Sequence, residues 1–593
     1  MRRSVPVAAI AAITSAGLLL AGCSGGKGSS NGSTEANAAT KGIVNASDEK
    51  GGTVTYAISD APESFDPGNT YYAFLYNFSR LYARPLTTFK PAPGPKGNEL
   101  VPDLAEAMGK PSDGGRTWTY KIRKGVKFED GTPVTARDVK YAVERSNFAR
   151  DVLSLGPNYF QQFLQDNEGG YQGPYKDEGK DEGKGKDEGK SRDGLKSIET
   201  PDERTIRFHL KRPFAEFDYL VSAPQTAPVP QAKDKGADYT RSVVSTGSYK
   251  FESYQEGKKL VLVRNPQWSN DELRKQLPEK IVLNMKVAQS TIDKDLRSGS
   301  TLVDLAGRGV EAQTQAELLT DPTERAHTDN ALGQRLVYTA INTKVKPFDN
   351  IECRKAVQYA IDKKAVQTAR GGPPRGEVAS TVLPSDIAGY QKYDLYPQKY
   401  KGDELDLTEA KKHWAACGAG KVTTTILARN DNQEEVDAAT SIIDSLKKIG
   451  ITVKPQQYPT GKYFSDYAGV PEFNKKNNVG LMMMQWGADF PTGYGYLQQI
   501  LHGKAISKSG NANLSELDDP KINQLLDSAI ANTDQAAREK AYAEIDKEAM
   551  KQAVIVPLAY FKVLNYRSPK ATNLVSSSAW SGQYDYLNIG VKK

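Results

Sequence analysis

Alternating and helical hydrophobic patterns follow one another along most of this chain. Residues 52–59 alternate apolar and polar side chains as a half-buried strand does, and residues 71–82 carry apolar side chains at helical spacing. The same patterns predict further strands at 116–122, 205–210, 248–254, 259–264, 281–287, 423–428, 453–457, 479–486 and 553–560. They predict further helices at 135–146, 354–369, 434–449 and 536–551. Strands and helices therefore interleave, which predicts an α/β fold rather than a bundle, solenoid or sandwich.

The N-terminus has the layout of a secretory signal peptide. Two arginines precede an apolar run that ends in small residues, so residues 1–22 are predicted to be removed during export. The small residues before Cys23 resemble the bacterial lipobox, which implies a lipidated cysteine at the mature N-terminus. Residues 23–49 begin rich in Gly and Ser, which predicts a flexible tether. We therefore expect an extracytoplasmic chain, lipid-anchored to the outer face of the cell membrane; the alternative is an ordinary signal peptide with an incidental cysteine.

Composition and charge exclude some partners. The 593 residues are 38% hydrophobic and 25% charged, and the formal net charge is +7. No dense Lys/Arg stripe interleaved with aromatic residues is present, so no nucleic-acid partner is expected. Residues 166–194 contain a Lys-Asp-Glu-Gly repeat that lacks core-forming side chains, which predicts a disordered insertion.

The chain offers little for catalysis. Its four histidines are scattered, and it has neither a nucleophile elbow nor a dinucleotide-binding glycine pattern. We therefore assign no catalytic residue, no metal ligand and no cofactor, and a secreted hydrolase is the least favoured alternative. Cys353 and Cys417 form an even pair in an oxidising compartment, which predicts a disulfide; two free thiols are the alternative.

Several segments resemble one family. Residues 125–139, Gly-Val-Lys-Phe-Glu-Asp-Gly-Thr-Pro-Val-Thr-Ala-Arg-Asp-Val, are similar to the signature of the family-5 extracellular solute-binding proteins of ABC importers. Further similar segments follow in the family order at 246–251, 263–268, 342–349, 353–362 and 485–491. The resemblance implies a periplasmic-binding-protein-like fold of two α/β lobes joined by a hinge, with an extra subdomain in the first lobe.

The resemblance also implies domain boundaries. The expected first lobe comprises 50–85, 200–341 and 559–593, the inserted subdomain 86–199, and the second lobe 342–558. Closure of the lobes around a ligand would produce the form that a membrane permease recognises.

In peptide-binding members, an aspartate in a Trp-x-Ala-Asp-x-Pro segment holds the ligand ammonium, which implies that role for Asp489; capping of a loop is the alternative. The remaining implied ligand-binding residues are Trp486 as an aromatic wall, Gly487 as a source of backbone groups, Asn342 at the hinge, and Tyr71, Tyr72 and Tyr560 on the first-lobe side.

The resemblance implies a monomeric receptor that captures peptides and delivers them to ABC permease subunits. A receptor for a sugar or a metal chelate, and a peptide-sensing surface receptor, are the alternatives. Some oligopeptide receptors carry a basic residue shortly before the tryptophan, but this chain has Met482–Gln485 there. A ligand carboxylate would then need Lys475 or Lys476, or would lie in solvent.

Overall fold

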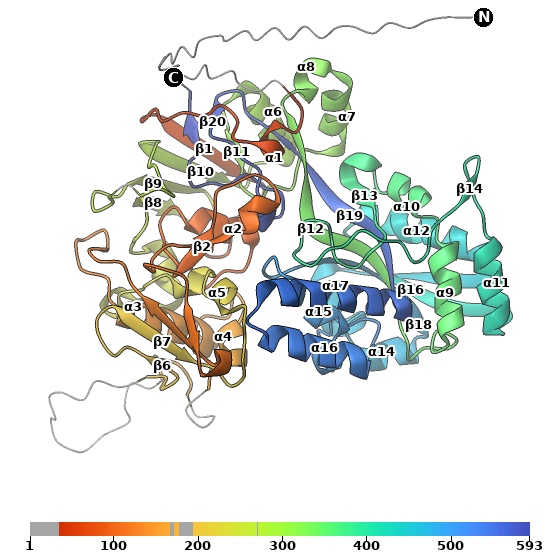
Figure 1. The fold of residues 1–593 in the computed structure, drawn as a ribbon. Helices are drawn as coiled ribbons and strands as arrows, with labels where there is room; N and C mark the ends of the chain where they lie inside the picture. The colour runs from red at the N-terminus through yellow and green to blue at the C-terminus, as the bar shows by residue number, and fades with distance from the viewer. Residues whose placement is uncertain (1–34, 166–170, 177–193, 270, 593) are drawn as a thin grey trace, which may run out of the picture. The chain divides into compact units, whose positions relative to one another are not determined.

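The first lobe is built on a mixed sheet of five strands in the order β11-β1-β10-β9-β8 (Figure 1). The computed structural model describes residues 35–165, 171–176, 194–269 and 271–592, all within the unit Gly32–Lys593. The strands of this sheet are β1 (Thr53–Ile58), β8 (Tyr249–Gln255), β9 (Lys259–Arg264), β10 (Lys280–Met285) and β11 (Val303–Asp304). β1 pairs in parallel with β10 and β11, whereas β8, β9 and β10 form an antiparallel meander. Four strands predicted from alternation are thereby confirmed.

The second lobe contains a six-stranded sheet in the order β13-β19-β12-β18-β16-β17. Its strands are β12 (Thr328–Ile341), β13 (Gly376–Val378), β16 (Val422–Arg429), β17 (Ile451–Tyr458), β18 (Val479–Gly487) and β19 (Ile555–Tyr566). Helix α12 (Gln433–Lys447) connects the parallel strands β16 and β17, as the predicted α/β alternation requires. The Asn432 side chain accepts a hydrogen bond from the Glu435 amide and caps this helix.

One predicted helix of the second lobe is divided. The expected helix at 354–369 is two helices, α9 (Ile351–Ala360) and α10 (Lys363–Ala369). The chain is extended at Ile361 and Asp362, and the Asp362 carboxylate accepts hydrogen bonds from the first amides of α10. Helix α11 (Thr408–Cys417) lies beside α9, and Cys353 and Cys417 join the two as a disulfide with Cα atoms 5.0 Å apart.

The inserted subdomain is a four-stranded antiparallel sheet, β4-β5-β7-β6, with α3 (Ala136–Phe148), α4 (Tyr159–Phe163) and α5 (Phe217–Leu220). The strands are β4 (Lys110–Ser112), β5 (Thr117–Lys121), β6 (Ile198–Glu199) and β7 (Thr205–His209). Because β7 pairs with both β5 and β6, the boundary expected at 199/200 falls inside this sheet. The subdomain therefore continues past residue 200.

Strands β12 and β19 are long partners that run from the first lobe into the six-stranded sheet (Figure 1). Their register shifts between Leu332 and Leu336, and Gln334 between them has a left-handed backbone with φ 54°. This irregularity lies before the lobe boundary expected at 341/342. It identifies the crossing segment as the part of β12 around Gln334.

The other elements complete the lobes. The remaining helices include α1 (Ala38–Lys41), α2 (Ala73–Ser79), α6 (Gln289–Ser298), α7 (Ala312–Thr320), α8 (Pro322–Arg325), α14 (Pro471–Lys476), α15 (Gly493–Leu501), α16 (Pro520–Ala531) and α17 (Gln535–Gln552). Three further strand pairs are β2 (Thr87–Phe89) with β3 (Leu100–Pro102), β14 (Tyr400–Lys401) with β15 (Glu404–Leu405), and β20 (Ala571–Thr572) with β21 (Gly590–Val591). No helix in the described part of the chain combines the length and apolar character needed to cross a bilayer.

Two segments expected to be flexible are partly packed. The signal peptide, Cys23 and most of the charged repeat lie outside the described residues. Residues 35–49 do not form a free tether, because the Ala39 amide donates to the buried Asp329 carboxylate and Val44 pairs with Leu574. Residues 171–176 also pack, and the Tyr175 hydroxyl donates to Asp234 at 2.5 Å.

Candidate functional site

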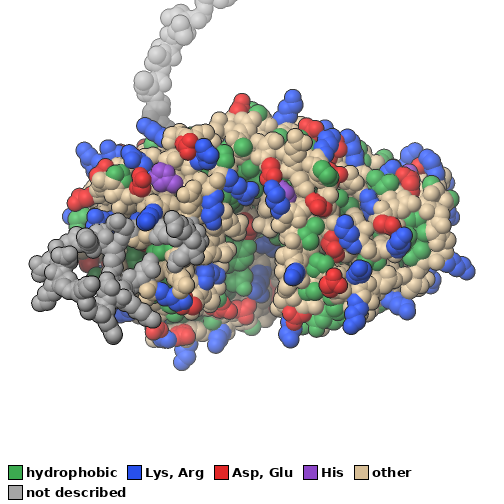
Figure 2. Space-filling model, turned by 90° about the horizontal axis from the view of Figure 1, so that it is seen from below, with side chains coloured by type: hydrophobic (Ala, Val, Ile, Leu, Met, Phe, Trp, Pro, Cys, Tyr) green, Lys and Arg blue, Asp and Glu red, His purple; other side chains and the backbone are tan. Residues whose placement is uncertain are grey.

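A cavity of about 510 Å³ lies where the first lobe, the inserted subdomain and the second lobe meet. That volume lies within the range of small-ligand sites. Seen from below, a furrow separates the part that carries the inserted sheet from the part that carries α15–α17 (Figure 2). The residues that line the cavity are Tyr71, Tyr72, Ala73, Tyr76, Phe89, Tyr159, Tyr219, Leu220, Ser222, Ala223, Gln334, Arg335, Arg429, Gln485, Gly487, Ala488, Asp489, Phe490, Pro491, Ala579, Trp580 and Ser581.

Asp489 is positioned by the short segment between β18 and α15. Phe490 follows it and stacks against Tyr219 with ring centroids 6.2 Å apart. Thr492 then caps α15, because its hydroxyl oxygen accepts a hydrogen bond from the Gly495 amide. The aromatic contact and the helix cap fix the backbone on one side of Asp489, and β18 fixes it on the other.

The Asp489 carboxylate is held by two hydroxyl groups. Tyr71 donates to it at 2.8 Å, and Tyr159 also forms a hydrogen bond with it. Burial raises the pKa of Asp489, and the two hydrogen bonds oppose that shift only in part. Among the described residues no lysine or arginine forms an ion pair with this carboxylate, so a bound cation would stabilise its charged form.

Tyr71 and Tyr72 are strongly exposed for tyrosines, at 52% and 58%, and both line the cavity. Tyr72 stacks against Phe74 with ring centroids 5.4 Å apart. Although about half of the Tyr71 surface is exposed, partial desolvation of its phenol group, followed by the charge of Asp489, raises the pKa of Tyr71. Tyr71 therefore stays protonated at neutral pH and acts as a hydrogen-bond donor.

Gly487 lines the cavity at the end of β18, directly opposite Arg335 of β12. A Cβ atom at position 487 would lie only 2.9 Å from Arg335 Cγ. The absence of a side chain at Gly487 therefore leaves room for the Arg335 side chain, a role that the sequence did not reveal.

Trp486 does not line the cavity. Side chains alternate along β18, so Gln485 and Gly487 face the cavity while Trp486 points to the other side. Its indole N–H donates to the Tyr496 carbonyl at 2.8 Å. The expected aromatic wall is instead provided by residues such as Tyr71.

Asn342 and Tyr560 are also absent from the cavity wall. Asn342 is fully buried, and its amide nitrogen donates to Glu516 at 2.8 Å. Tyr560 is 6% exposed, and its hydroxyl lies 2.5 Å from that of Thr381. Both side chains are engaged inside the second lobe, so their expected ligand contacts are not supported.

Other cavity residues were missed. Tyr159 comes from the inserted subdomain and Arg335 from β12, and the sequence analysis singled out neither residue. Lys475 and Lys476, proposed from the sequence as carboxylate ligands, are exposed in α14 and do not line the cavity.

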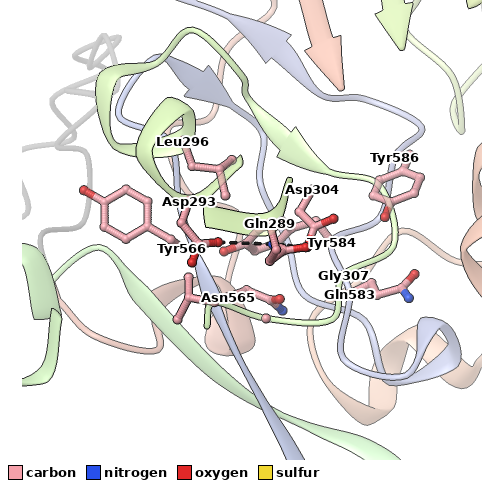
Figure 3. A pocket seen from close by; sticks show the side chains of 12 residues that line it. Gln289, Asp293, Leu296, Asp304, Gly307, Asn565, Tyr566, Gln583, Tyr584 and Tyr586 are labelled. Atoms are coloured by element: carbon pink, nitrogen blue, oxygen red, sulfur yellow. Dashed lines mark hydrogen bonds between the residues drawn. The ribbon is translucent and has the colours of Figure 1, made fainter. Parts of the chain in front are cut away.

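A second cavity in the first lobe is too small for a ligand. It measures about 10 Å³, room for no more than one water molecule (Figure 3). The Gln289 amide donates to Asp293 at 3.1 Å and to Asp304 at 3.3 Å, and burial raises the pKa of Asp304 to about 6. Within the described ranges, no group of three or more His, Cys, Asp or Glu side chains is arranged to hold a metal ion.

The crossing strands and the cavity at the junction define a two-lobed binding protein. The family model described as "Bacterial extracellular solute-binding proteins, family 5 Middle" matches residues 99–508. The chain belongs to family 5 of the bacterial extracellular solute-binding proteins.

Individual relatives cover nearly the whole chain. The probable D,D-dipeptide-binding periplasmic protein DdpA of Escherichia coli is 25% identical over 84% of this chain and 86% of its own. Heme-binding protein A of Haemophilus influenzae is 26% identical over 95% and 96%. The solved structure of clavulanic acid biosynthesis oligopeptide binding protein 2 has 37% identity and a TM-score of 0.88, covering 95% of this chain and 99% of the other. These relatives are named as binding proteins, not as enzymes.

Proposed function

We propose that this chain is an extracytoplasmic receptor that captures a peptide by its N-terminal ammonium and delivers it to an ABC-type permease. The observation that carries the proposal is the Asp489 carboxylate, which lies in the cavity without an ion-pair partner among the described residues. An ammonium group placed there would gain a charge-assisted hydrogen bond in a partly desolvated site. The aromatic lining would then cover the peptide side chains and exclude water.

The names of the relatives support a peptide ligand. A D,D-dipeptide-binding protein and two oligopeptide-binding proteins are similar to this chain over three quarters of its length or more. Similarity to a haem-binding protein makes another small solute the alternative. The cavity is lined by residues of both lobes, which supports a hinge motion that closes the lobes around the ligand. Such a closure would bury the ligand without any covalent chemistry.

Location and partners complete the proposal. Cys23 carries the lipid anchor, the mature chain is a monomer on the outer face of the cell membrane, and ABC permease subunits receive the ligand. Tethering would raise the effective concentration of the receptor beside its permease. A Cys23→Ser variant should be released from the membrane and still bind its ligand.

Native mass spectrometry of the protein purified from its host tests the function. We expect a co-purified peptide with a free N-terminus. A co-purified sugar, haem or metal chelate would replace the peptide proposal with that solute class. Permease and ATPase genes beside the receptor gene would support import, and their absence would support a peptide-sensing receptor.

A further inference from the structure

Arg335 brings to the cavity a positive charge that no carboxylate of the described residues pairs with. Its side chain is partly buried, and the guanidinium lies over the Phe561 ring at 5.4 Å. Among the described residues it makes no ion pair. Burial lowers the pKa of Arg335, and no neighbouring carboxylate counteracts that shift. Because arginine remains protonated in proteins, the cavity holds a partly desolvated cation that has no ion-pair partner among the residues that the structure describes.

The second arginine at the cavity is different. Arg429 Nε donates to Glu435 Oε2 at 2.9 Å, in a pair whose side chains are 13% and 5% exposed. Burial acts to lower the pKa of Arg429, but the hydrogen bond and charge of Glu435 outweigh it. The charge of Arg429 is therefore already balanced within the protein, whereas the charge of Arg335 is not.

The strand pairing brings Arg335 to the same wall as Asp489. Arg335 is the register partner of Gly487, and its side chain crosses the space that a larger residue at 487 would fill. Asp489 follows Gly487 by two residues, yet Asp489 and Arg335 form no ion pair with each other. The wall therefore presents two separate charges of opposite sign, and neither has an ion-pair partner in the described part of the chain.

We propose that Arg335 binds a carboxylate of the ligand while Asp489 binds its ammonium, so that the receptor selects ligands that carry both charges. A guanidinium can donate two parallel hydrogen bonds, one to each oxygen of a carboxylate. The carboxylate belongs either to the C-terminus of a short peptide or to an aspartate or glutamate side chain. The peptide part of this inference rests on the proposed function.

Competition between peptide libraries tests the role of Arg335. The full-length mature chain is incubated with random di- to pentapeptides in three forms: free, C-terminally amidated and N-acetylated. Captured peptides are identified by native mass spectrometry. We expect free peptides to be captured about tenfold more than amides, and Arg335→Gln to bring that ratio close to one. The Lys475→Gln/Lys476→Gln double variant is the control and should keep the ratio of the unmodified chain.

The outcomes separate the two proposals. Amides enriched in Asp or Glu would identify a side-chain carboxylate and support the role of Arg335. Equal capture of free and amidated peptides without that enrichment would overturn it, while a continuing need for a free N-terminus would leave the proposed function standing. Capture of no peptide from any library would overturn both. If Arg335→Gln does not fold, the ratio of free to amidated peptides captured is compared between the unmodified chain and Gly487→Ala, in which the added Cβ displaces the Arg335 side chain. A lower ratio in Gly487→Ala would support the role of Arg335, and an equal ratio would overturn it.

Discussion

Tyr71 donates a hydrogen bond of 2.8 Å to Asp489 across 418 residues of sequence. One partner follows the first strand of the first lobe, and the other follows β18 of the second lobe. The bond therefore joins the two sides of the cavity at the Asp489 carboxylate, which we propose binds the ammonium group of the ligand. It also explains how Asp489 can remain charged when burial favours its neutral form.

Replacing Asp489 tests the ammonium site. We expect Asp489→Asn and Asp489→Ala to weaken binding of free peptides at least tenfold, about 1.4 kcal/mol, because the charge that pairs with the ammonium is lost. Isothermal titration calorimetry with a peptide that the unmodified chain captures measures this loss. N-acetylated peptides should bind weakly to all forms.

The stability of the same variants separates binding from loop capping. The raised pKa of Asp489 means that its charged form costs folding free energy at neutral pH, so Asp489→Asn should have an equal or higher Tm. A lower Tm with unchanged affinity would support the loop-cap alternative. Asp403→Asn, on an exposed turn, serves as the control.

Removing the Tyr71 hydroxyl should shift the pH dependence of binding. Ammonium binding requires ionised Asp489, so affinity falls as pH drops through the pKa of that carboxylate in the free protein. Tyr71→Phe removes a donor that lowers this pKa, and the loss of affinity should therefore begin at a higher pH. Calorimetry from pH 4 to pH 8 measures the midpoint. Tyr72→Phe, which alters a neighbouring cavity residue, should keep the original midpoint, and an unchanged midpoint in Tyr71→Phe would contradict the assignment.

Much of the fold follows from local sequence. β1, β8, β9 and β10 come from period-two alternation, and the β16-α12-β17 unit comes from a strand, helix and strand of ordinary length. The break between α9 and α10 was less visible, because apolar spacing continues through it while Asp362 starts a new helix. The subdomain boundary was missed because strand pairing between β5 and β7 is a long-range property.

The site was predictable only in part. Family resemblance pointed to Asp489, Gly487, Tyr71 and Tyr72, and the structure places all four at the cavity. Arg335 required the register between β12 and β18, which no pattern within either strand specifies. Tyr159 required the position of the inserted subdomain against the second lobe.

Glu216 links the inserted subdomain to the second lobe, and a substitution that weakens this contact should shift the receptor toward an open form. Its carboxylate accepts hydrogen bonds from Thr492 at 2.6 Å and from Tyr542 at 2.7 Å. Arg538 of α17 also forms an ion pair with this carboxylate at 3.6 Å. Glu216→Gln loses this ion pair and a buried hydrogen bond, so it should lower affinity about tenfold. Because Glu216 does not line the cavity, ligand preference should not change.

Calorimetry with free and amidated peptides measures the effect of Glu216→Gln, and small-angle scattering reports opening. Glu544→Gln, an exposed residue of α17, is the matched control. A changed preference between free and amidated peptides would show that Glu216 acts at the ligand instead.

The disulfide should contribute to stability. It closes a loop between positions 64 residues apart and joins α9 to α11. In a Cys23→Ser background, the Cys353→Ala/Cys417→Ala variant should lose about 2–4 kcal/mol of unfolding free energy, measured by urea denaturation. Thiol titration of the unfolded, unreduced Cys23→Ser chain should find no free thiol. Two reactive thiols would contradict the pairing.

Asp386 should make stability fall as pH rises. This side chain is 4% exposed, and burial raises its pKa to about 7 from the ordinary 3.8. Folding therefore favours the protonated form, and the stabilisation present at low pH is lost as pH rises toward and through about 7. Asp386→Asn cannot ionise, so its Tm relative to the unmodified chain should increase by about 2 °C or more between pH 5 and pH 8. Differential scanning fluorimetry at these pH values measures the difference, with Asp403→Asn as the exposed control; a difference that stays constant with pH would show that Asp386 does not titrate in this window.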